Sequence, residues 1–340
     1  MTAQNLRELF ANTRMPAMAA PMFLVSSPEL VIASSRAGIV GTYAAPNARN
    51  IGALDEALSL ISTGVSQSGA APWALNMIVH SSYDRFDAEL ELVLRYQPKI
   101  VTTALGSPRR VLEHVHCYGG FVMADVATPA MARKAVDAGV DGLILVCAGA
   151  GGHTGTYHPF SFVDEVRQFW RGPIGLAGAI SVGAHIRAAQ QIGADFAVLG
   201  TRFIAAEESM VQPAYRDMLV ESSMEDLVAS KAVSGVLANW LRPTLDRAGL
   251  SATQLSEEKK IDFSGDISTA PKAWRDVWSA GHGVGAVTAI EPVSAIVDRL
   301  AQEYANSLAS EREAIKRLSD QLESWQAGSA SVGCGEGVTQ

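Results

Sequence analysis

Eight short apolar segments, each followed by a helical pattern, recur along the first 200 residues of this 340-residue chain. The segments lack a strict alternation of apolar and polar side chains, which is typical of parallel strands buried on both faces. Eight such βα units favour a closed (β/α)8 TIM barrel, an α/β fold, over an open doubly wound sheet. The predicted strands cover residues 15–23, 38–43, 73–80, 99–105, 120–126, 141–147, 173–180 and 195–200.

The composition excludes several other classes of protein. Hydrophobic residues make up 48% and charged residues 18% of the chain, so a large core forms and disorder is not its main state. The net charge of −8 argues against a general nucleic-acid binder. Three cysteines give no disulfide framework, and no His/Cys spacing predicts a metal site. The apolar runs are too short to span a membrane and residues 1–14 too polar for a signal peptide, so we expect a cytoplasmic protein.

The βα pattern ends after Phe203. We expect the barrel to comprise residues 1–205 plus 291–326. Residues 206–290 carry helical stretches interrupted by glycine and proline, and predict a mostly helical inserted subdomain after strand eight that covers the active site. Residues 291–326 end in a long charged helical pattern that could pack on a second copy in a homo-oligomer. The small, polar residues 327–340 predict a disordered tail.

Small residues follow predicted strands seven and eight, where TIM barrels often bind phosphate. Gly178-Ala179 and Gly200-Thr201 would let backbone N–H groups approach an anion closely. Ser181 and Thr201 could add hydroxyl donors, and the helix starting near residue 182 would point its positive end at the anion. The alternative is that these glycines only make tight βα turns.

A single histidine follows predicted strand six among four glycines. His153 lies within Gly149-Ala150-Gly151-Gly152-His153-Thr154-Gly155, and glycines let a backbone pass close to a flat ligand. Histidine is suited to proton transfer or to binding an anion near neutral pH. The alternative is an incidental histidine on a flexible surface loop. We interpret the other six histidines as structural or surface residues.

Residues 281–286 match a dinucleotide-binding pattern, G-x-G-x-x-A, without its context. The preceding Trp278-Ser279-Ala280 is not a strand, and no βαβ unit encloses the glycines. The pattern therefore does not indicate a dinucleotide site. Residues 278–285 could still line a pocket, because they lead from the insertion back to the barrel.

Taken together and in order, these motifs resemble those of the nitronate monooxygenases, FMN-dependent TIM-barrel enzymes, over about residues 15–300. The motifs are Ala20-Pro21-Met22, Asn76, Ala150-Gly151-Gly152-His153-Thr154-Gly155, Leu176-Ala177-Gly178-Ala179-Ile180, Gly193-Ala194-Asp195, Gly200-Thr201-Arg202-Phe203 and Trp278-Ser279-Ala280-Gly281.

The resemblance implies non-covalently bound FMN. Its phosphate would lie on residues 178–179 and 200–201, its isoalloxazine edge would face the backbone of residues 21–23, and His153 would be the catalytic residue beside it. The implied cofactor-binding residues are Ala20, Pro21, Met22, Phe23, Asn76, Ala150, Gly151, Gly152, Gly178, Ala179, Gly200 and Thr201.

The implied activity is oxidation of alkyl nitronates with O2 to a carbonyl compound and nitrite. Related flavin barrels leave two alternatives, an NAD(P)H-dependent oxidoreductase of the quinone or enoyl-ACP reductase type and a non-catalytic flavin-binding protein. Two positions depart from the family pattern. Many relatives carry a lysine late in strand five, where this chain has Val122-Met123-Ala124-Asp125, and Gln or Asp late in strand six, where it has Val146-Cys147.

Overall fold

The computed structural model describes residues 3–66, 69–250 and 271–332. In this part of the chain, eight parallel strands form one sheet in the order β1-β9-β8-β6-β5-β4-β3-β2. A parallel bridge between Met18 and Val40 joins the two ends of the sheet and closes the barrel. The strands are β1 (Ala17–Ala19), β2 (Gly41–Ala44), β3 (Trp73–Ile78), β4 (Ile100–Ala104), β5 (Phe121–Val126), β6 (Gly142–Val146), β8 (Ile174–Ala177) and β9 (Phe196–Leu199).

The predicted TIM barrel is confirmed, and each of the eight predicted strands overlaps one observed strand. The largest difference is in the first strand, which ends at Ala19 rather than Phe23. Pro21 has no N–H group to donate to a neighbouring strand, so the ladder cannot continue through it. The backbone instead turns, and the Met22 N–H group donates to Ser26 Oγ at 3.0 Å.

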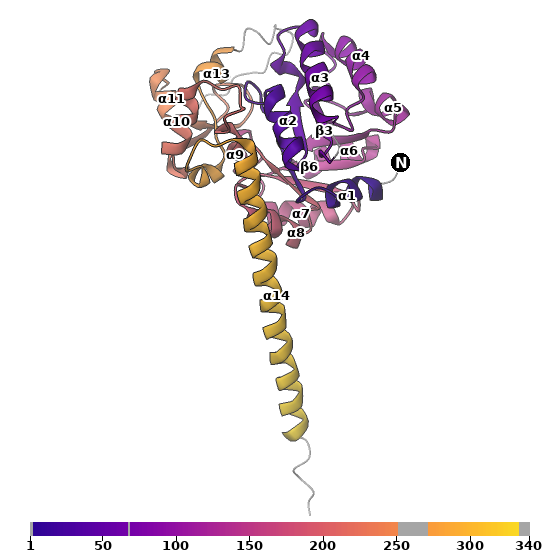
Figure 1. Cartoon of the computed structure of the whole chain (residues 1–340), viewed down its shortest axis with the longest axis vertical. Coiled ribbons are helices and arrows are strands. Elements are labelled where there is room, and N and C mark those ends of the chain that lie inside the picture. Colours follow the sequence, from indigo (N-terminus) through magenta and orange to yellow (C-terminus); the bar gives the residue numbers. More distant parts are fainter. Residues whose placement is uncertain (1–2, 67–68, 251–270, 333–340) are drawn as a thin grey trace, which may run out of the picture.

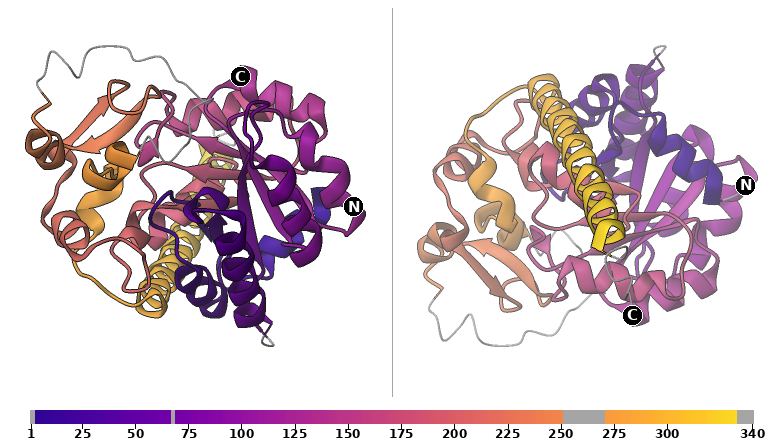
Figure 2. Two further views of the ribbon diagram at one scale, coloured as in Figure 1. Left: turned by 90° about the horizontal axis from the view of Figure 1, so that it is seen from above. Right: turned by 90° about the horizontal axis from the view of Figure 1, so that it is seen from below.

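Helices surround the barrel on its outer face, and the inserted residues lie beside it (Figures 1 and 2). Several helices begin with a side-chain cap followed by proline: Ser27 accepts from the Leu30 N–H group at α2, and Thr128 accepts from that of Met131 at α6. The outer helices are α2 (Pro28–Ala37), α3 (Ile51–Val65), α4 (Phe86–Tyr96), α5 (Arg109–Cys117), α6 (Pro129–Ala138), α7 (Pro159–Arg167), α8 (Gly183–Gln191) and the short α9 (Thr201–Ile204), and the 3-10 turn η1 (Ala45–Asn47) follows β2.

The N-terminal helix α1 (Ala3–Ala11) fills the amino-terminal end of the barrel. Leu6 and Phe10 are fully buried there in one apolar cluster with inward-facing strand residues such as Phe121 and Phe196. The rings of Phe10 and Phe196 stack with their centroids 3.7 Å apart. This end of the barrel is therefore packed with apolar side chains.

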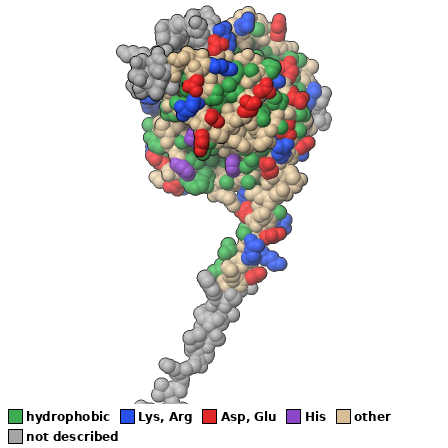
Figure 3. Space-filling view, turned by 90° about the vertical axis from the view of Figure 1, so that its left-hand side faces the viewer, with side chains coloured by type: hydrophobic (Ala, Val, Ile, Leu, Met, Phe, Trp, Pro, Cys, Tyr) green, Lys and Arg blue, Asp and Glu red, His purple; other side chains and the backbone are tan. Residues whose placement is uncertain are grey.

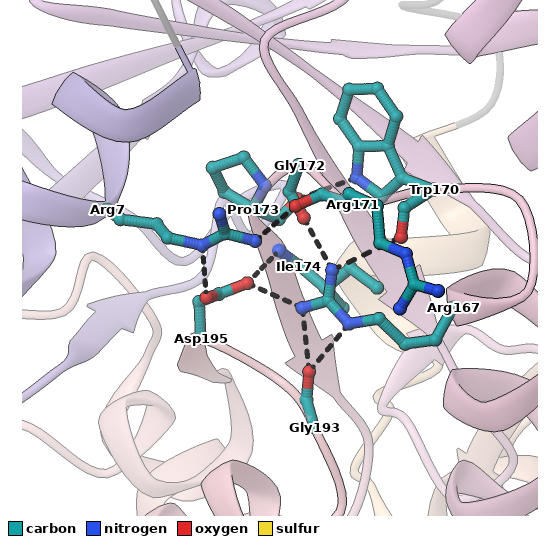
Figure 4. Close-up of polar contacts among 9 residues, drawn as sticks. All are labelled: Arg7, Arg167, Trp170, Arg171, Gly172, Pro173, Ile174, Gly193 and Asp195. Atoms are coloured by element: carbon teal, nitrogen blue, oxygen red, sulfur yellow. Dashed lines mark hydrogen bonds and ion pairs between the residues drawn. The ribbon is translucent and has the colours of Figure 1, made fainter.

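A network of charged groups centred on Asp195 ties α1 to the barrel (Figure 4). One carboxylate oxygen accepts from Arg7 Nε at 2.7 Å, and the other accepts from an Arg167 guanidinium nitrogen at 2.7 Å and from the Ile174 backbone N–H at 2.8 Å. Arg167 also donates to the backbone carbonyls of Gly172 and Gly193. Asp195 thus links α1, α7, β8 and the start of β9.

The inserted region adds strands that the sequence did not predict. Its helical elements are α10 (Pro213–Glu221), η2 (Met224–Asp226), α11 (Arg242–Arg247), α13 (Pro271–Asp276) and η4 (His282–Ala286). Between them, β10 (Leu227–Ser230) and β11 (Ala238–Leu241) pair antiparallel, and β11 also pairs with β7 (Gly152–His153). Residues 251–270 lie outside the described residues.

Helix α14 (Val293–Val332) packs against α8 and α2 and then leaves the body of the molecule (Figures 1 and 3). Arg187 on α8 holds Glu311 through two charged hydrogen bonds of 2.6 and 2.9 Å. Beyond that point Ile315 and Leu318 are 56% and 58% exposed. The helix enters the segment 327–340, for which the sequence predicted disorder, and residues 333–340 lie outside the described residues. No described helix is both long and apolar enough to cross a membrane.

Replacement of Asp195 by alanine should destabilise the fold. The change leaves Arg167, whose side chain is 19% exposed, without its carboxylate partner, and we expect a loss of about 2–4 kcal/mol in the free energy of unfolding. Urea denaturation measures it. The matched control is Asp298→Ala, which removes an exposed ion pair with Arg14 and should cost less than about 1 kcal/mol. Equal losses in the two variants would contradict a structural role for the Asp195 network.

Candidate active site

A cavity of about 790 Å³ lies at the carboxyl ends of the barrel strands. Its lining comes from β2, β3, β4, β5, β6, β8 and β9, from the segment after β1 and those after several of the other strands, and from the insertion. The structure brings every sequence-predicted site residue to this cavity, and their individual roles stay predictions. These residues are Ala20, Pro21, Met22, Phe23, Asn76, Ala150, Gly151, Gly152, His153, Gly178, Ala179, Gly200 and Thr201.

Two polar side chains that line the cavity meet across β4, one from β3 and one from β5. Phe121 and Met123 on β5 point into the barrel, so the alternation of a strand points Asp125 the same way. Asn76 on β3 donates from Nδ2 to Thr102 Oγ1 at 2.8 Å and to Asp125 Oδ2 at 3.2 Å. Asn76 is therefore oriented by two partners.

Asp125 is a cavity residue that sequence reasoning missed. Its second oxygen, Oδ1, is buried and has no hydrogen-bond partner among the described residues. Burial raises the pKa of the Asp125 carboxyl to about 7, and the hydrogen bond from Asn76 opposes this shift. The signal available in the sequence was its place at the end of a strand, two residues after the inward-facing Met123.

An anion could bind at the turn after β8. Gly178 has a φ of +131°, a backbone conformation that favours glycine, and Ala179 has a φ of +55°, which is uncommon for a residue with a side chain. Such strain often marks a functional site. The buried Ser181 hydroxyl has no hydrogen-bond partner in the described residues. The turn thus presents an unused donor beside a strained backbone.

Residues 281–286, at the end of the insertion, pack against this turn. The Gly281 N–H group donates to Thr201 Oγ1 at 2.8 Å, so the Thr201 hydroxyl hydrogen stays available to an anion. The His282 N–H group donates to the Gly149 carbonyl at 2.9 Å. A Cβ atom on Gly283 would lie 2.0 Å from Ser181 Oγ, so this backbone lies directly against the serine. The expected pocket-lining role of residues 278–285 is confirmed for Ser279 and Gly283.

The amino terminus of α8 differs from the expectation. The helix begins at Gly183, and its first N–H group donates to Glu303 of α14 at 2.7 Å. A carboxylate 120 residues away therefore already occupies one of the donors that the sequence assigned to an anion. The Ser181 and Thr201 hydroxyls are the better-supported donors.

His153 lies in a short strand rather than in a flexible loop. Antiparallel pairing aligns His153 with Ala238 and Gly152 with Asn239. Asn239 Nδ2 also donates to the Ala150 carbonyl at 2.8 Å. The insertion therefore holds the glycine-rich segment against the barrel.

Two tryptophans from the insertion form a wall next to His153. The Trp274 and His153 rings meet edge to face with centroids 5.4 Å apart, and Trp240 packs on Trp274 at 4.5 Å. The imidazole faces the cavity, and the surrounding protein lowers its pKa below the usual value because desolvation disfavours the charged form. The lowered pKa favours the neutral imidazole, which can accept a proton.

Other titratable side chains on the cavity are His80, Tyr83 and Tyr215. The buried Tyr215 hydroxyl donates to the Ser279 carbonyl, and burial raises its pKa to about 12. Tyr83 donates to the buried Glu89 at 2.7 Å. No group of three or more potential metal-ligating side chains occurs in the described ranges.

Replacement of Trp274 by alanine should raise the pKa of His153 towards its usual value. The smaller side chain admits water to one face of the imidazole, which favours the protonated form. An NMR pH titration of the His153 ring measures the change. Phe160→Ala is the matched control, since Phe160 packs edge to face on the exposed His158 at 4.9 Å and should leave the His153 titration unchanged. An unaltered His153 pKa in Trp274→Ala would show that the indole does not desolvate the ring.

Comparisons with known proteins agree with this architecture. The sequence matches the nitronate monooxygenase family over residues 5–303. A nitronate monooxygenase from Paraburkholderia phytofirmans is 27% identical over 75% of this chain and 74% of its own length. A second, from Pseudomonas aeruginosa, is 26% identical over 85% of this chain and 95% of its own.

Two solved structures share the fold. A nitroalkane oxidase from Streptomyces ansochromogenes has a TM-score of 0.76 at 24% identity, covering 89% of this chain and 99% of its own. FabK from Thermotoga maritima has a TM-score of 0.76 at 24% identity, covering 91% and 98%. The family match spans the barrel and the segments that line its cavity, and the chain therefore belongs to the nitronate monooxygenase family of oxidoreductases.

Proposed function

We propose that this protein binds FMN in the cavity and oxidises alkyl nitronates with O2 to a carbonyl compound and nitrite. The observation that carries the proposal is the meeting of His153 and the unpartnered Ser181 hydroxyl on the same cavity. The family membership and the similarity to named nitronate monooxygenases support it.

The residues present fit a flavin mononucleotide. Ser181 and Thr201 offer hydroxyl groups to a single phosphate, and Gly178 and Gly200 leave the adjacent space without side chains. A Cβ on Gly200 would lie 3.6 Å from Ala20 and Met22, so the strand-one segment borders the same space. Asn76 and the backbone of residues 20–23 would hold the ring system. FMN supplies the electron-accepting step and the subsequent reaction with O2.

His153 has two distinct tasks in this chemistry. A nitronate is already deprotonated, so the imidazole need only bind its nitro oxygens or pass on a proton. A neutral nitroalkane requires removal of a carbon-bound proton, for which a neutral imidazole is suited. Since the His153 pKa is lowered, the base form is present at and below pH 7.

The second candidate is an NAD(P)H-dependent flavin oxidoreductase that acts on a quinone or an enoyl thioester. The similarity of the fold to FabK and the large cavity are consistent with this second candidate. Anaerobic mixing of the flavin-loaded protein with a nitronate or with NAD(P)H separates the two. Bleaching by nitronate alone supports the first candidate, and rapid bleaching by NAD(P)H alone contradicts it. No bleaching by any donor would favour a non-catalytic flavin protein. A cytoplasmic location and a homo-oligomer also remain proposals.

Replacement of Ser181 by alanine should weaken FMN binding about tenfold, because a hydrogen bond to a charged phosphate is worth about 1.5 kcal/mol. Fluorescence titration with FMN and with riboflavin measures both affinities. The loss should appear for FMN and not for riboflavin, which lacks the phosphate. Ser209→Ala is the matched control, because Ser209 does not line the cavity and its buried hydroxyl donates to the Ile204 carbonyl. An equal loss of affinity for FMN and for riboflavin would show that the phosphate does not bind at Ser181.

Replacement of His153 by alanine should separate nitroalkanes from nitronates. If His153 removes the carbon-bound proton, nitroalkane turnover should fall about 10²- to 10⁴-fold. Nitronate turnover should change mainly through a higher KM, because only binding is lost. Steady-state oxygen consumption measures both, with His158→Ala on the same segment as control.

In the wild type, kcat/KM for the nitroalkane should rise with pH through a pKa below 6.5. Wild-type kinetics of His153→Ala on both substrates would place the active site elsewhere.

A further inference from the structure

Asp125 lines the cavity, and its Oδ1 oxygen is buried without a hydrogen-bond partner among the described residues. The inward-facing neighbours on the adjacent strands, Ala104 on β4 and Ile144 on β6, are apolar. Asn76 engages only Oδ2, at 3.2 Å. A buried oxygen without a partner destabilises the folded protein, so a ligand group that reaches Oδ1 would offset that cost.

We propose that Asp125 is a cofactor-contacting acid, which hydrogen-bonds the polar edge of the flavin ring system through Oδ1 while Oδ2 stays on Asn76. This inference rests on the proposed binding of FMN. Asn76 then acts as a positioning residue, because its bonds to Thr102 and Asp125 hold the carboxyl in place.

The protonation state of Asp125 decides what it does to the flavin. As a neutral acid it donates a hydrogen bond to a ring carbonyl, which favours the electron-rich reduced flavin. As a carboxylate, Asp125 repels the negative charge of the reduced flavin. The raised pKa of Asp125, about 7, brings both forms into the physiological range. The reduction potential of the bound flavin should therefore respond to the ionisation of this one carboxyl.

Few other groups on the cavity could produce the same response. The side chains that border Asp125, namely Asn76, Thr102, Ala104, Ile144 and Val146, carry no charge. The titratable groups elsewhere on the cavity are His80, Tyr83, His153 and Tyr215. Burial raises the pKa values of both tyrosines well above neutrality. The two histidines are therefore the groups from which Asp125 has to be distinguished.

The test compares flavin-loaded wild type with Asp125→Asn, which keeps the shape and a donor but cannot ionise. Midpoint potentials are measured between pH 5.5 and 8.5 against reference dyes. The two proteins should agree at low pH. At high pH the wild-type potential should lie lower by about 30 mV, the equivalent of a tenfold weaker preference for reduced flavin in a two-electron couple.

Four further variants make the result specific. Asp125→Ala, which removes the group, should raise the Kd for FMN about tenfold. Asp141→Asn is the matched control, since Asp141 precedes β6 at the opposite end of the barrel, where it accepts from the Val122 N–H group at 2.8 Å. It should match the wild type in potential and Kd. His153→Ala should keep the wild-type pH response of the potential, and His80→Ala should do the same.

The outcomes separate this inference from the function on which it rests. Wild type that cannot be loaded with FMN overturns both. Wild type that binds FMN, with the same potentials in Asp125→Asn and the same Kd in Asp125→Ala, overturns only the role of Asp125. A pH response that disappears in His153→Ala or His80→Ala assigns the ionisation to that histidine and also overturns it. If Asp125→Ala does not fold, the Asp125→Asn potentials still decide.

Discussion

The parallel bridge between Met18 and Val40 closes the ring of strands, and the position of the site depends on that closure. Because all eight strands run in one direction, their carboxyl ends lie on one rim. Ala20, Asn76, Asp125 and His153 are distant in sequence, yet each lies near the carboxyl end of a barrel strand or in the segment after one. An open sheet of the same strand order would leave β1, which Ala20 follows, at one edge and β3, which carries Asn76, next to the opposite edge.

The two ends of the barrel use polar groups in opposite ways. At the amino-terminal end, Asp195 has three donors and lies over an apolar cluster that includes Phe10 and Phe196. Its groups are satisfied within the protein, so they serve stability. At the carboxyl end, Ser181 and Asp125 each keep an oxygen without a partner. Such groups disfavour the ligand-free state and are suited to binding. The same fold thus separates stability from chemistry along its axis.

The sequence predicted the barrel and the cavity segments because both depend on local patterns. The strand-helix alternation fixed the number of strands, and glycine-rich turns marked the anion site and His153. The remaining features come from contacts distant in sequence. Pairing of β7 with β11 joins two residues to a strand more than 80 positions away, and neither strand has a strong local signal. The hydrogen bond from the first N–H group of α8 to Glu303 is equally distant in sequence. Asp125 was visible only as a departure from the family pattern, although strand alternation already pointed it inward.

The strained and unsatisfied groups of the cavity place a joint requirement on any ligand. Ala179 holds a left-handed backbone and Ser181 a free hydroxyl after β8, while Asp125 presents a free oxygen from β5. A ligand that bonded only the Ser181 hydroxyl or only the Asp125 oxygen would leave the other group buried without a hydrogen-bond partner in the bound state. An anionic group joined to a flat ring with a polar edge can satisfy both, and its binding then stabilises the folded chain as well. The selectivity of the cavity for such a ligand follows from groups that the barrel alone leaves without partners.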